Sequence, residues 1–193
     1  MNEELDIALI EAFLNSHDLD DRDWFTSDEP ALFDDWATGN GAARGAHDPP
    51  VATSRAAAEV IRNLVVGHPA TPAEVELVRE ARDCVIAMLL DGEPNELDRF
   101  VRELPVRMRV GMGSAVEVEP AARGPLGVAA AAMLAAHRLA VSGDWPRLRL
   151  CRSEDCHWAF FDRSKNHSRV WCSMGGCGAR AKARAYRERQ RTR

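Results

Sequence analysis

The segment CRSEDCHWAFFDRSKNHSRVWCSMGGCGAR, residues 151–180, decides how the C-terminal part of this 193-residue chain folds. It holds two C-x4-C pairs separated by 15 residues, formed by Cys151, Cys156, Cys172 and Cys177. Two short pairs joined by a spacer of this length can close tetrahedrally around one Zn²⁺ ion. Four thiolates complete the coordination of the ion and leave no position for water. The spacing therefore predicts one structural zinc ion per chain.

Two alternatives to a four-thiolate zinc site are open at the level of sequence. The cysteines could form two disulfides, but disulfides persist in oxidising compartments. Residues 1–26 are acidic and do not resemble a secretory signal, so we expect a cytoplasmic protein with reduced thiols. His157 and His167 are close enough in sequence to replace a thiolate. Because four cysteines already complete a tetrahedron, surface or supporting positions are expected for both histidines.

The residues around the cysteines predict a strand, a turn and a helix. Residues 156–162 alternate like a short strand, residues 147–150 form another, and Ser173 is placed to cap a helix that carries Cys177. Fewer than about 40 residues cannot bury enough apolar surface to fold unaided, so the metal is expected to hold this module together. Residues 145–193 are therefore interpreted as a small zinc module similar to a treble clef.

The charge of the chain is divided between its two parts. Residues 145–193 hold 13 Lys and Arg against 4 Asp and Glu, a net charge of +9, so residues 1–144 carry −14 of the overall −5. A zinc ion with four thiolates has a formal charge of −2, which two or three cations would offset. The remaining excess of about six positive charges indicates contact with a polyanion. A solvated basic tail is the alternative.

The C-terminal basic residues show helical spacing from Met174 to about Gln190. Four arginines recur on one face, and a neighbouring stripe of Ala179, Ala183, Tyr186 and Gln190 is expected to pack against Trp158, Phe160 or Trp171. Arginines on a rigid helix can contact phosphates or a major groove. The candidate nucleic-acid contacts are Arg163, Lys165 and Arg169 in the loop between the pairs, with Arg180, Lys182, Arg184, Arg187 and Arg191 on the helix.

Residues 1–144 read as a mostly helical domain with one small β-hairpin, which makes the whole chain α+β. The hairpin is predicted from alternating residues at 106–110 and 116–119. Helices are predicted near 3–15, 30–38, 54–66, 72–90, 94–103 and 125–142.

Residues 1–144 contain no motif that predicts catalysis. They lack a Gly-rich phosphate loop, a His-x-x-x-His pair and a nucleophile elbow, so we do not expect an enzyme. Cys84 lies on the apolar stripe of a predicted helix and is expected to be a buried, inert thiol. The most apolar stretch, residues 126–141, is interrupted by His137 and Arg138, so no membrane span is expected.

The C-terminal cysteine module resembles the CGNR zinc-finger family. The resemblance rests on the two cysteine pairs, on Trp158, Phe160 and Asp162, and on the run Cys177-Gly178-Ala179-Arg180. Two positions depart from the family pattern, because Ala179 replaces the name-giving asparagine and Glu154 replaces a common proline. Neither change removes a zinc ligand.

Upstream residues are similar to the ABATE domain that usually precedes this finger. The similarity covers the helix ending in Asn15-Ser16, the pair Asp35-Trp36, the helix with Arg82 and the run 95–97. The resemblance implies a bacterial, DNA-binding, stress-induced transcription regulator whose N-terminal domain senses or assembles. Asn15, Asp35, Trp36 and Arg82 are candidates for an N-terminal ligand site, with a small-molecule effector as a candidate partner.

Two rival functions accompany this expectation. The first is a zinc-stabilised module that binds protein or RNA. The second is an enzyme with its site near Asn15, Asp35 and Arg82, which would need a deep polar pocket there.

Overall fold

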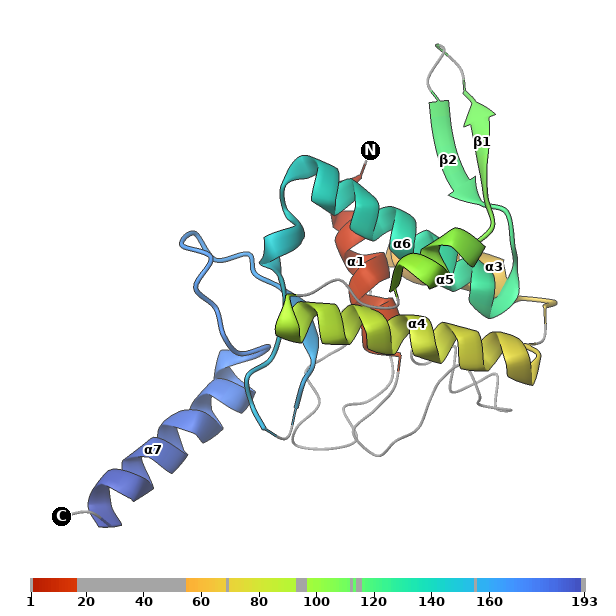
Figure 1. The fold of residues 1–193 in the computed structure, drawn as a ribbon. Helices are drawn as coiled ribbons and strands as arrows, with labels where there is room; N and C mark the ends of the chain where they lie inside the picture. Colours follow the sequence, from red (N-terminus) through yellow and green to blue (C-terminus); the bar gives the residue numbers. More distant parts are fainter. Residues whose placement is uncertain are drawn as a thin grey trace.

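The computed structural model describes residues 2–16, 55–68, 70–92, 97–111, 113, 116–154 and 156–191. The helix expected at residues 30–38, together with Asp35 and Trp36, lies outside these ranges. The other predicted helices are confirmed with small shifts of their ends, and the chain is α+β as expected (Figure 1). The N-terminal helices are α1 (Glu3–Leu14), α3 (Arg55–Val65), α4 (Pro72–Asp91), α5 (Leu97–Glu103) and α6 (Gly124–Ser142).

Local signals determine where several helices begin and end. Asn2 caps α1, because its Oδ1 accepts a hydrogen bond from the Leu5 amide at 3.3 Å. Thr71 and Glu74 form a reciprocal capping box at the start of α4, with Pro72 in the first turn. Gly92 ends α4 with a positive φ of 72°, the left-handed conformation that glycine adopts without steric cost.

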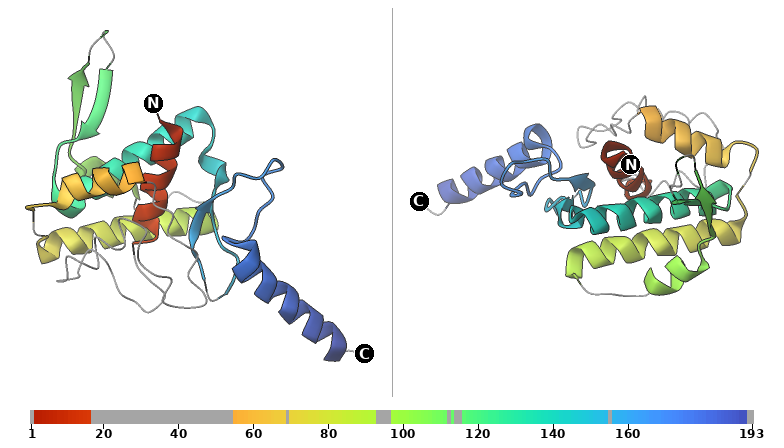
Figure 2. Two further views of the ribbon diagram at one scale, coloured as in Figure 1. Left: turned by 180° about the vertical axis from the view of Figure 1, so that it is seen from behind. Right: turned by 90° about the horizontal axis from the view of Figure 1, so that it is seen from above.

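Helix α6 lies at the centre of the N-terminal core. It contacts α1, α3 and α4, and the view from above shows these helices arranged around it (Figure 2). Its alanine-rich surface lets the neighbours approach closely, and the large side chains of α1, among them Ile10 and Phe13, fill the space between them. By length and composition α6 could cross a membrane, contrary to the sequence-based expectation. In the structure, however, 56% of its apolar window is buried inside the protein, as in a core helix of a soluble protein.

An ion pair between α1 and α6 joins the two central helices. Arg138 donates to both carboxylate oxygens of Asp6 at 2.5–2.9 Å, and Asp6 is only 4% exposed. A buried carboxylate requires such a partner, because its desolvation is otherwise unfavourable.

A β-hairpin projects from one end of this helical body. Strands β1 (Val106–Val110) and β2 (Val116–Pro120) pair antiparallel with Met108 opposite Val118, as the alternation predicted (Figure 1). All five residues of β1 are exposed.

The C-terminal module starts with a 3-10 turn, η2 (Trp145–Arg147). Strands β3 (Leu148–Leu150) and β4 (Ala159–Phe161) then form a second antiparallel hairpin. A π-helical turn, η3 (Met174–Gly178), leads into the final helix α7 (Ala179–Arg191), which extends away from the body in every view (Figures 1 and 2). The expected helix from Met174 therefore begins as a wider turn before it becomes α-helical.

The hydrophobic core crosses the compositional boundary at residues 144 and 145. Leu148, Leu150, Ala159 and Phe161 of the second hairpin belong to the same buried cluster as α1, α4 and α6. The strands of the zinc module are thus also part of the helical core.

Candidate metal centre

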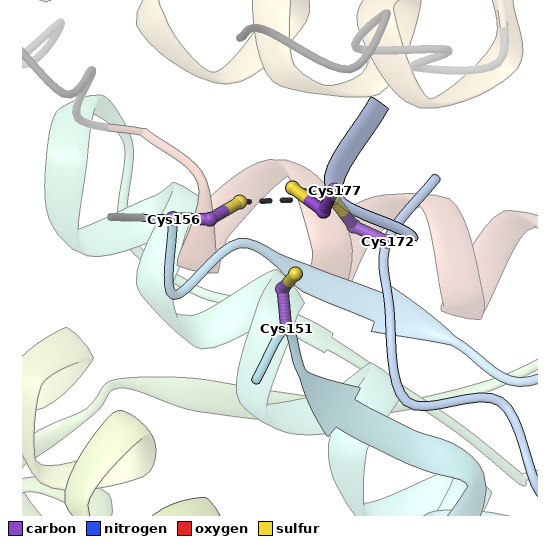
Figure 3. Close-up of side chains that lie close together, drawn as sticks. All are labelled: Cys151, Cys156, Cys172 and Cys177. Atoms are coloured by element: carbon purple, nitrogen blue, oxygen red, sulfur yellow. Dashed lines mark hydrogen bonds between the residues drawn. The ribbon is translucent and has the colours of Figure 1, made fainter. Parts of the chain in front are cut away.

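The four predicted ligands converge on one point in the structure. Their sulfur atoms all lie within 4.8 Å of one another, and all four side chains are buried (Figure 3). The Sγ–Sγ distances are 3.6 Å from Cys156 to Cys172 and 3.7 Å from Cys172 to Cys177. A tetrahedron with zinc–sulfur bonds of about 2.3 Å has edges of about 3.8 Å. The cluster therefore fits one structural zinc ion.

The same distances exclude disulfides in this structure. A disulfide requires a sulfur–sulfur separation of about 2.05 Å, and all four cysteines are free thiols. His157 and His167 are both exposed and lie at turns with φ of 48°. The metal-ligating group among the described residues consists of the four cysteines, as predicted. Cys84 is partly buried and packs against the helical core instead.

Backbone hydrogen bonds shape the two loops that present the thiols. Cys151 follows β3, and its amide donates to the Trp158 carbonyl at 2.9 Å, while the Cys156 amide donates to the Ser153 carbonyl at 3.0 Å. In the second loop, Ser173 caps η3 as predicted, since its Oγ accepts from the Gly176 amide at 3.1 Å.

Little space surrounds the backbone at position 178. A Cβ on Gly178 would lie 3.2 Å from Trp171 Cδ1 and 3.3 Å from Met174 Sδ. Trp171 packs against the thiol cluster and covers it. Glycine therefore lets this cover approach the start of α7 closely.

The thiols cannot all ionise without a cation. A hydrogen bond from Cys172 lowers the pKa of Cys156 to about 5. The hydrogen bond to Cys156, together with burial and the nearby negative charge, raises the pKa of Cys172, and burial raises that of Cys177 to about 11. Without a cation, the negative charge of Cys156 disfavours ionisation of Cys172 and Cys177 by raising their pKa values. Zn²⁺ would supply the positive charge that allows four thiolates to coexist.

Arg180 supports the metal cluster from the first turn of α7. Its guanidinium donates to Cys177 Sγ at 2.9 Å. A charge-assisted hydrogen bond of this kind stabilises a thiolate and offsets part of the −2 charge of a zinc site. The sequence analysis placed Arg180 among nucleic-acid contacts, and the structure shows that this guanidinium also binds a zinc ligand.

Arg169 holds the loop between the two cysteine pairs. Its Nε donates to the Trp171 carbonyl at 2.8 Å, a second nitrogen donates to the Cys172 carbonyl, and its guanidinium lies 4.8 Å from the centre of the Phe160 ring. The side chain is therefore engaged inside the finger. Its main contribution in this structure is to position the backbone around Cys172.

Asp162 organises the same loop from inside the protein. It is fully buried, and its two carboxylate oxygens accept from the amides of Ser164 and Arg169 at 2.9 Å each. Burial would raise its pKa, but hydrogen bonds from Ser164, the Arg169 amide and the charge of Arg149 together lower the pKa below its usual value. The loop therefore depends on an ionised Asp162.

The zinc finger is joined to helix α1 through the open edge of β4. The Asn15 side chain donates to the Ala159 carbonyl and accepts from the Ala159 amide, both at 2.9 Å. Glu11 Oε1 accepts from the Phe161 amide at 2.6 Å. One side chain of α1, Glu11, and one at its C-cap, Asn15, thus form the hydrogen bonds that a third strand would make with the edge of β4. The α1 helix and the zinc finger are fixed to each other by these contacts.

The predicted N-terminal ligand site is only partly visible. Asn15 is 5% exposed, and its side chain is hydrogen-bonded to the backbone of Ala159. Arg82 is also buried and donates to Ser16 Oγ at 2.9 Å. Asp35 and Trp36 lie outside the described residues. The structure therefore assigns Asn15 a structural contact, and a ligand site at these four residues stays a prediction.

The candidate nucleic-acid residues differ in exposure, since Arg169 and Arg180 are half-buried and the others are exposed. Arg163 and Lys165 are both exposed, and Arg163 pairs with Glu4 at 2.7 Å and lies over the Phe161 ring. From residue 182 to residue 191 every side chain of α7 is exposed. The expected packing of the stripe with Ala183, Tyr186 and Gln190 is therefore wrong. Those side chains offer little apolar area, and Trp158 and Trp171 already pack on the thiol cluster.

The sequence did not reveal the contacts that Glu11, Arg147 and Arg149 make with the zinc finger. Arg149 donates to the His167 carbonyl at 2.7 Å, and Arg147 lies 4.7 Å from the centre of the Phe161 ring. The alternation of residues 147–150 marks a strand but does not show what its arginines bind. Only Asp162-x-Ser164, a common loop-capping pattern, carried a local signal.

Comparison with known proteins supports this view of the metal centre. Residues 147–190 match the family model of the CGNR zinc finger. No curated protein matches the chain significantly, and an ABATE domain is not detected upstream. The matched segment contains all four cysteines and the helix that follows them. Residues 147–190 are a zinc finger of the CGNR family.

Proposed function

We propose that this chain is a DNA-binding transcription regulator whose CGNR finger presents α7 to DNA. The observation that carries the proposal is the exposure of α7 along nearly its whole length. Among its thirteen described residues none is buried, yet it starts directly at the metal cluster. A helix with so little packing must be held by its first turn, and it leaves nearly its whole surface for a partner.

The charge and dimensions of α7 match a nucleic-acid groove. It carries six arginine or lysine residues against one glutamate, a net charge of +5. Thirteen residues make a helix about 20 Å long and about 10–12 Å wide. The major groove of B-form DNA is about 12 Å wide and accepts an α-helix. Phosphates line both sides of such a groove, where exposed arginines gain most from releasing counterions.

The basic residues of the finger have different roles in this proposal. Arg169 and Arg180 are engaged with the loop carbonyls and with Cys177 Sγ, so they position the finger and α7. Exposed side chains contact the phosphates instead. This group consists of Lys165 in the loop and Lys182, Arg184, Arg187 and Arg191 on α7.

The N-terminal helices are proposed to regulate the finger. The resemblance of the residues around Asn15 and Arg82 to an ABATE domain supports this role. An effector is proposed to bind near these residues. The contacts of Asn15 and Glu11 with β4 provide a physical route, because a shift of α1 would move β4 and the loop that carries Cys156. We place this regulator in a bacterial cytoplasm, where the thiols stay reduced.

Fluorescence anisotropy with a labelled duplex of about 25 base pairs tests the proposal across a salt series. The double variant Arg187→Gln/Arg191→Gln removes two charges from α7. The matched control, Arg99→Gln/Arg102→Gln, removes two exposed charges from α5. Each lost phosphate contact should reduce the slope of log affinity against log salt by about 0.9, so the α7 variant loses about 1.8 and the control nothing.

Arg180→Ala independently tests the distinction between arginines that position the finger and arginines that contact phosphates. Because Arg180 is assigned to positioning, this variant should release zinc faster, which Arg187→Gln/Arg191→Gln should not do. Absence of salt-dependent DNA binding at about 50 mM salt would refute the proposal. Binding to RNA or protein under the same conditions would then favour an interaction module.

A further inference from the structure

The β1–β2 hairpin exposes a continuous apolar face. Val106, Met108 and Val110 of β1 lie opposite Pro120, Val118 and Val116 of β2, so all six side chains share one side of the ribbon. Met108 is 77% exposed, Val110 79% and Val116 64%. The hairpin stands away from the helical body, at the end opposite α7 (Figures 1 and 2).

Such a ribbon is expected to need a cover. A two-stranded hairpin is at best marginally stable in water unless another layer packs on its apolar face. The valines and Met108 have high strand propensity but contribute stability mainly when they are buried. A second surface on this face would therefore stabilise the hairpin and remove the exposed apolar area from water.

The charges of the reverse face are compatible with a second copy of the hairpin as this surface. Arg107 and Arg109 lie on β1, and Glu117 and Glu119 on β2, so the hairpin is neutral although the whole chain carries −5. Two copies of this hairpin do not repel each other by net charge. The apolar face itself has no charged residue, so it is complementary to a copy of itself.

The same charges disfavour the other symmetric way of joining two copies. A two-fold axis between hairpin edges would place β1 beside β1, or β2 beside β2. Arginines would then face arginines, or glutamates face glutamates, and like charges directly opposite are destabilising. Two hairpins stacked face to face, with about 10 Å between their ribbons, avoid this arrangement and keep every charge in water.

We propose that the chain forms a weak two-fold dimer by stacking the apolar faces of two β1–β2 hairpins. Five residues per strand give a face about 17 Å long and about 10 Å wide. This area is small beside the roughly 800 Å² per partner of a stable interface. The dimer therefore forms at high concentration, and it leaves both α7 helices free at its far ends. This inference does not depend on DNA binding.

Sedimentation equilibrium of the full, zinc-loaded chain tests the proposal. The average mass should rise from 21.3 kDa towards twice that value between about 1 and about 500 µM protein. Met108→Glu should weaken association at least about tenfold, because it buries a charge in the apolar contact. The matched control, Arg109→Gln, also makes the chain one charge more negative, but it lies on the reverse face and should leave association unchanged.

A charge exchange distinguishes a second copy from any other occupant of the face. Met108→Glu and Met108→Lys should each fail to associate alone, and their mixture should recover association with opposite charges paired across the two-fold axis. The proposal is overturned if the mass stays at 21.3 kDa throughout. It is equally overturned if Met108→Glu behaves like Arg109→Gln, or if the mixture does not associate.

Discussion

Replacing Asn15 by alanine should separate the zinc finger from the helical body. The Asn15 amide makes two hydrogen bonds of 2.9 Å with the backbone of Ala159, a residue 144 positions away in sequence. Both residues are buried, at 5% and 2% exposure, so water cannot readily replace the lost side chain. Asn15→Ala would leave the amide and the carbonyl of Ala159 without these partners.

The cost follows from these two backbone groups. A buried donor or acceptor that loses its partner destabilises a protein by about 1–3 kcal/mol. Two such groups predict a loss of about 2–6 kcal/mol, and relaxation of the β4 edge favours the lower half of that range. Because a domain is stable by only about 5–15 kcal/mol, this loss would be a large fraction of the total.

Urea unfolding of the zinc-loaded protein, followed by tryptophan fluorescence, measures the loss. Asn63→Ala is the matched control, since Asn63 is exposed on α3. Zinc transfer to a chelator should also be faster in Asn15→Ala, because Cys156 lies three residues before Ala159. A destabilisation below about 0.5 kcal/mol, equal to that of Asn63→Ala, would refute this account of the joint.

Three further perturbations have defined outcomes. Arg138→Ala should destabilise the protein by about 2–4 kcal/mol in urea, because Asp6 stays buried without its partner; no change would contradict the role of this ion pair. Burial raises the pKa of Glu11 above 4.5, so its stabilising contribution is present at low pH and is lost as pH rises through the raised value. Glu11→Gln should therefore gain stability relative to the native chain from about pH 4 to about pH 7. A difference in unfolding free energy that stays constant across this range would argue against a buried Glu11 with a raised pKa. Metal analysis should find about one zinc per chain, lost in Cys177→Ser and kept in Cys84→Ser; less than about half a zinc in the native chain would refute the structural site.

The zinc ligands could be predicted from sequence because their signal is local. Two C-x4-C pairs and a spacer bring four thiols together through short loops, so no distant residue is needed to identify them. Helix ends were equally local, as with Thr71-Pro72 before α4 and Gly92 after it. The alternation of the β1–β2 strands likewise predicted their pairing but not their exposure.

The roles of the basic and polar side chains could not be predicted in this way. Arg180 fits the spacing of an arginine row, yet it donates to Cys177 Sγ, and Arg169 donates to carbonyls of its own loop. Sequence periodicity gives the face of a helix on which a side chain lies. It does not give the groups that the side chain meets within a few ångströms.

The sequence by itself therefore determined the metal, its four ligands, the helical segments among the described residues and the division of charge. Only the tertiary structure decided that Asn15 and Glu11 bind the edge of β4, that one core crosses residue 144, and that α7 extends unpacked from the zinc cluster. The physical reason is the range of the interactions. Ligand spacing and helix capping act over a few residues, whereas packing depends on groups far apart in the chain that leave no shared pattern in it.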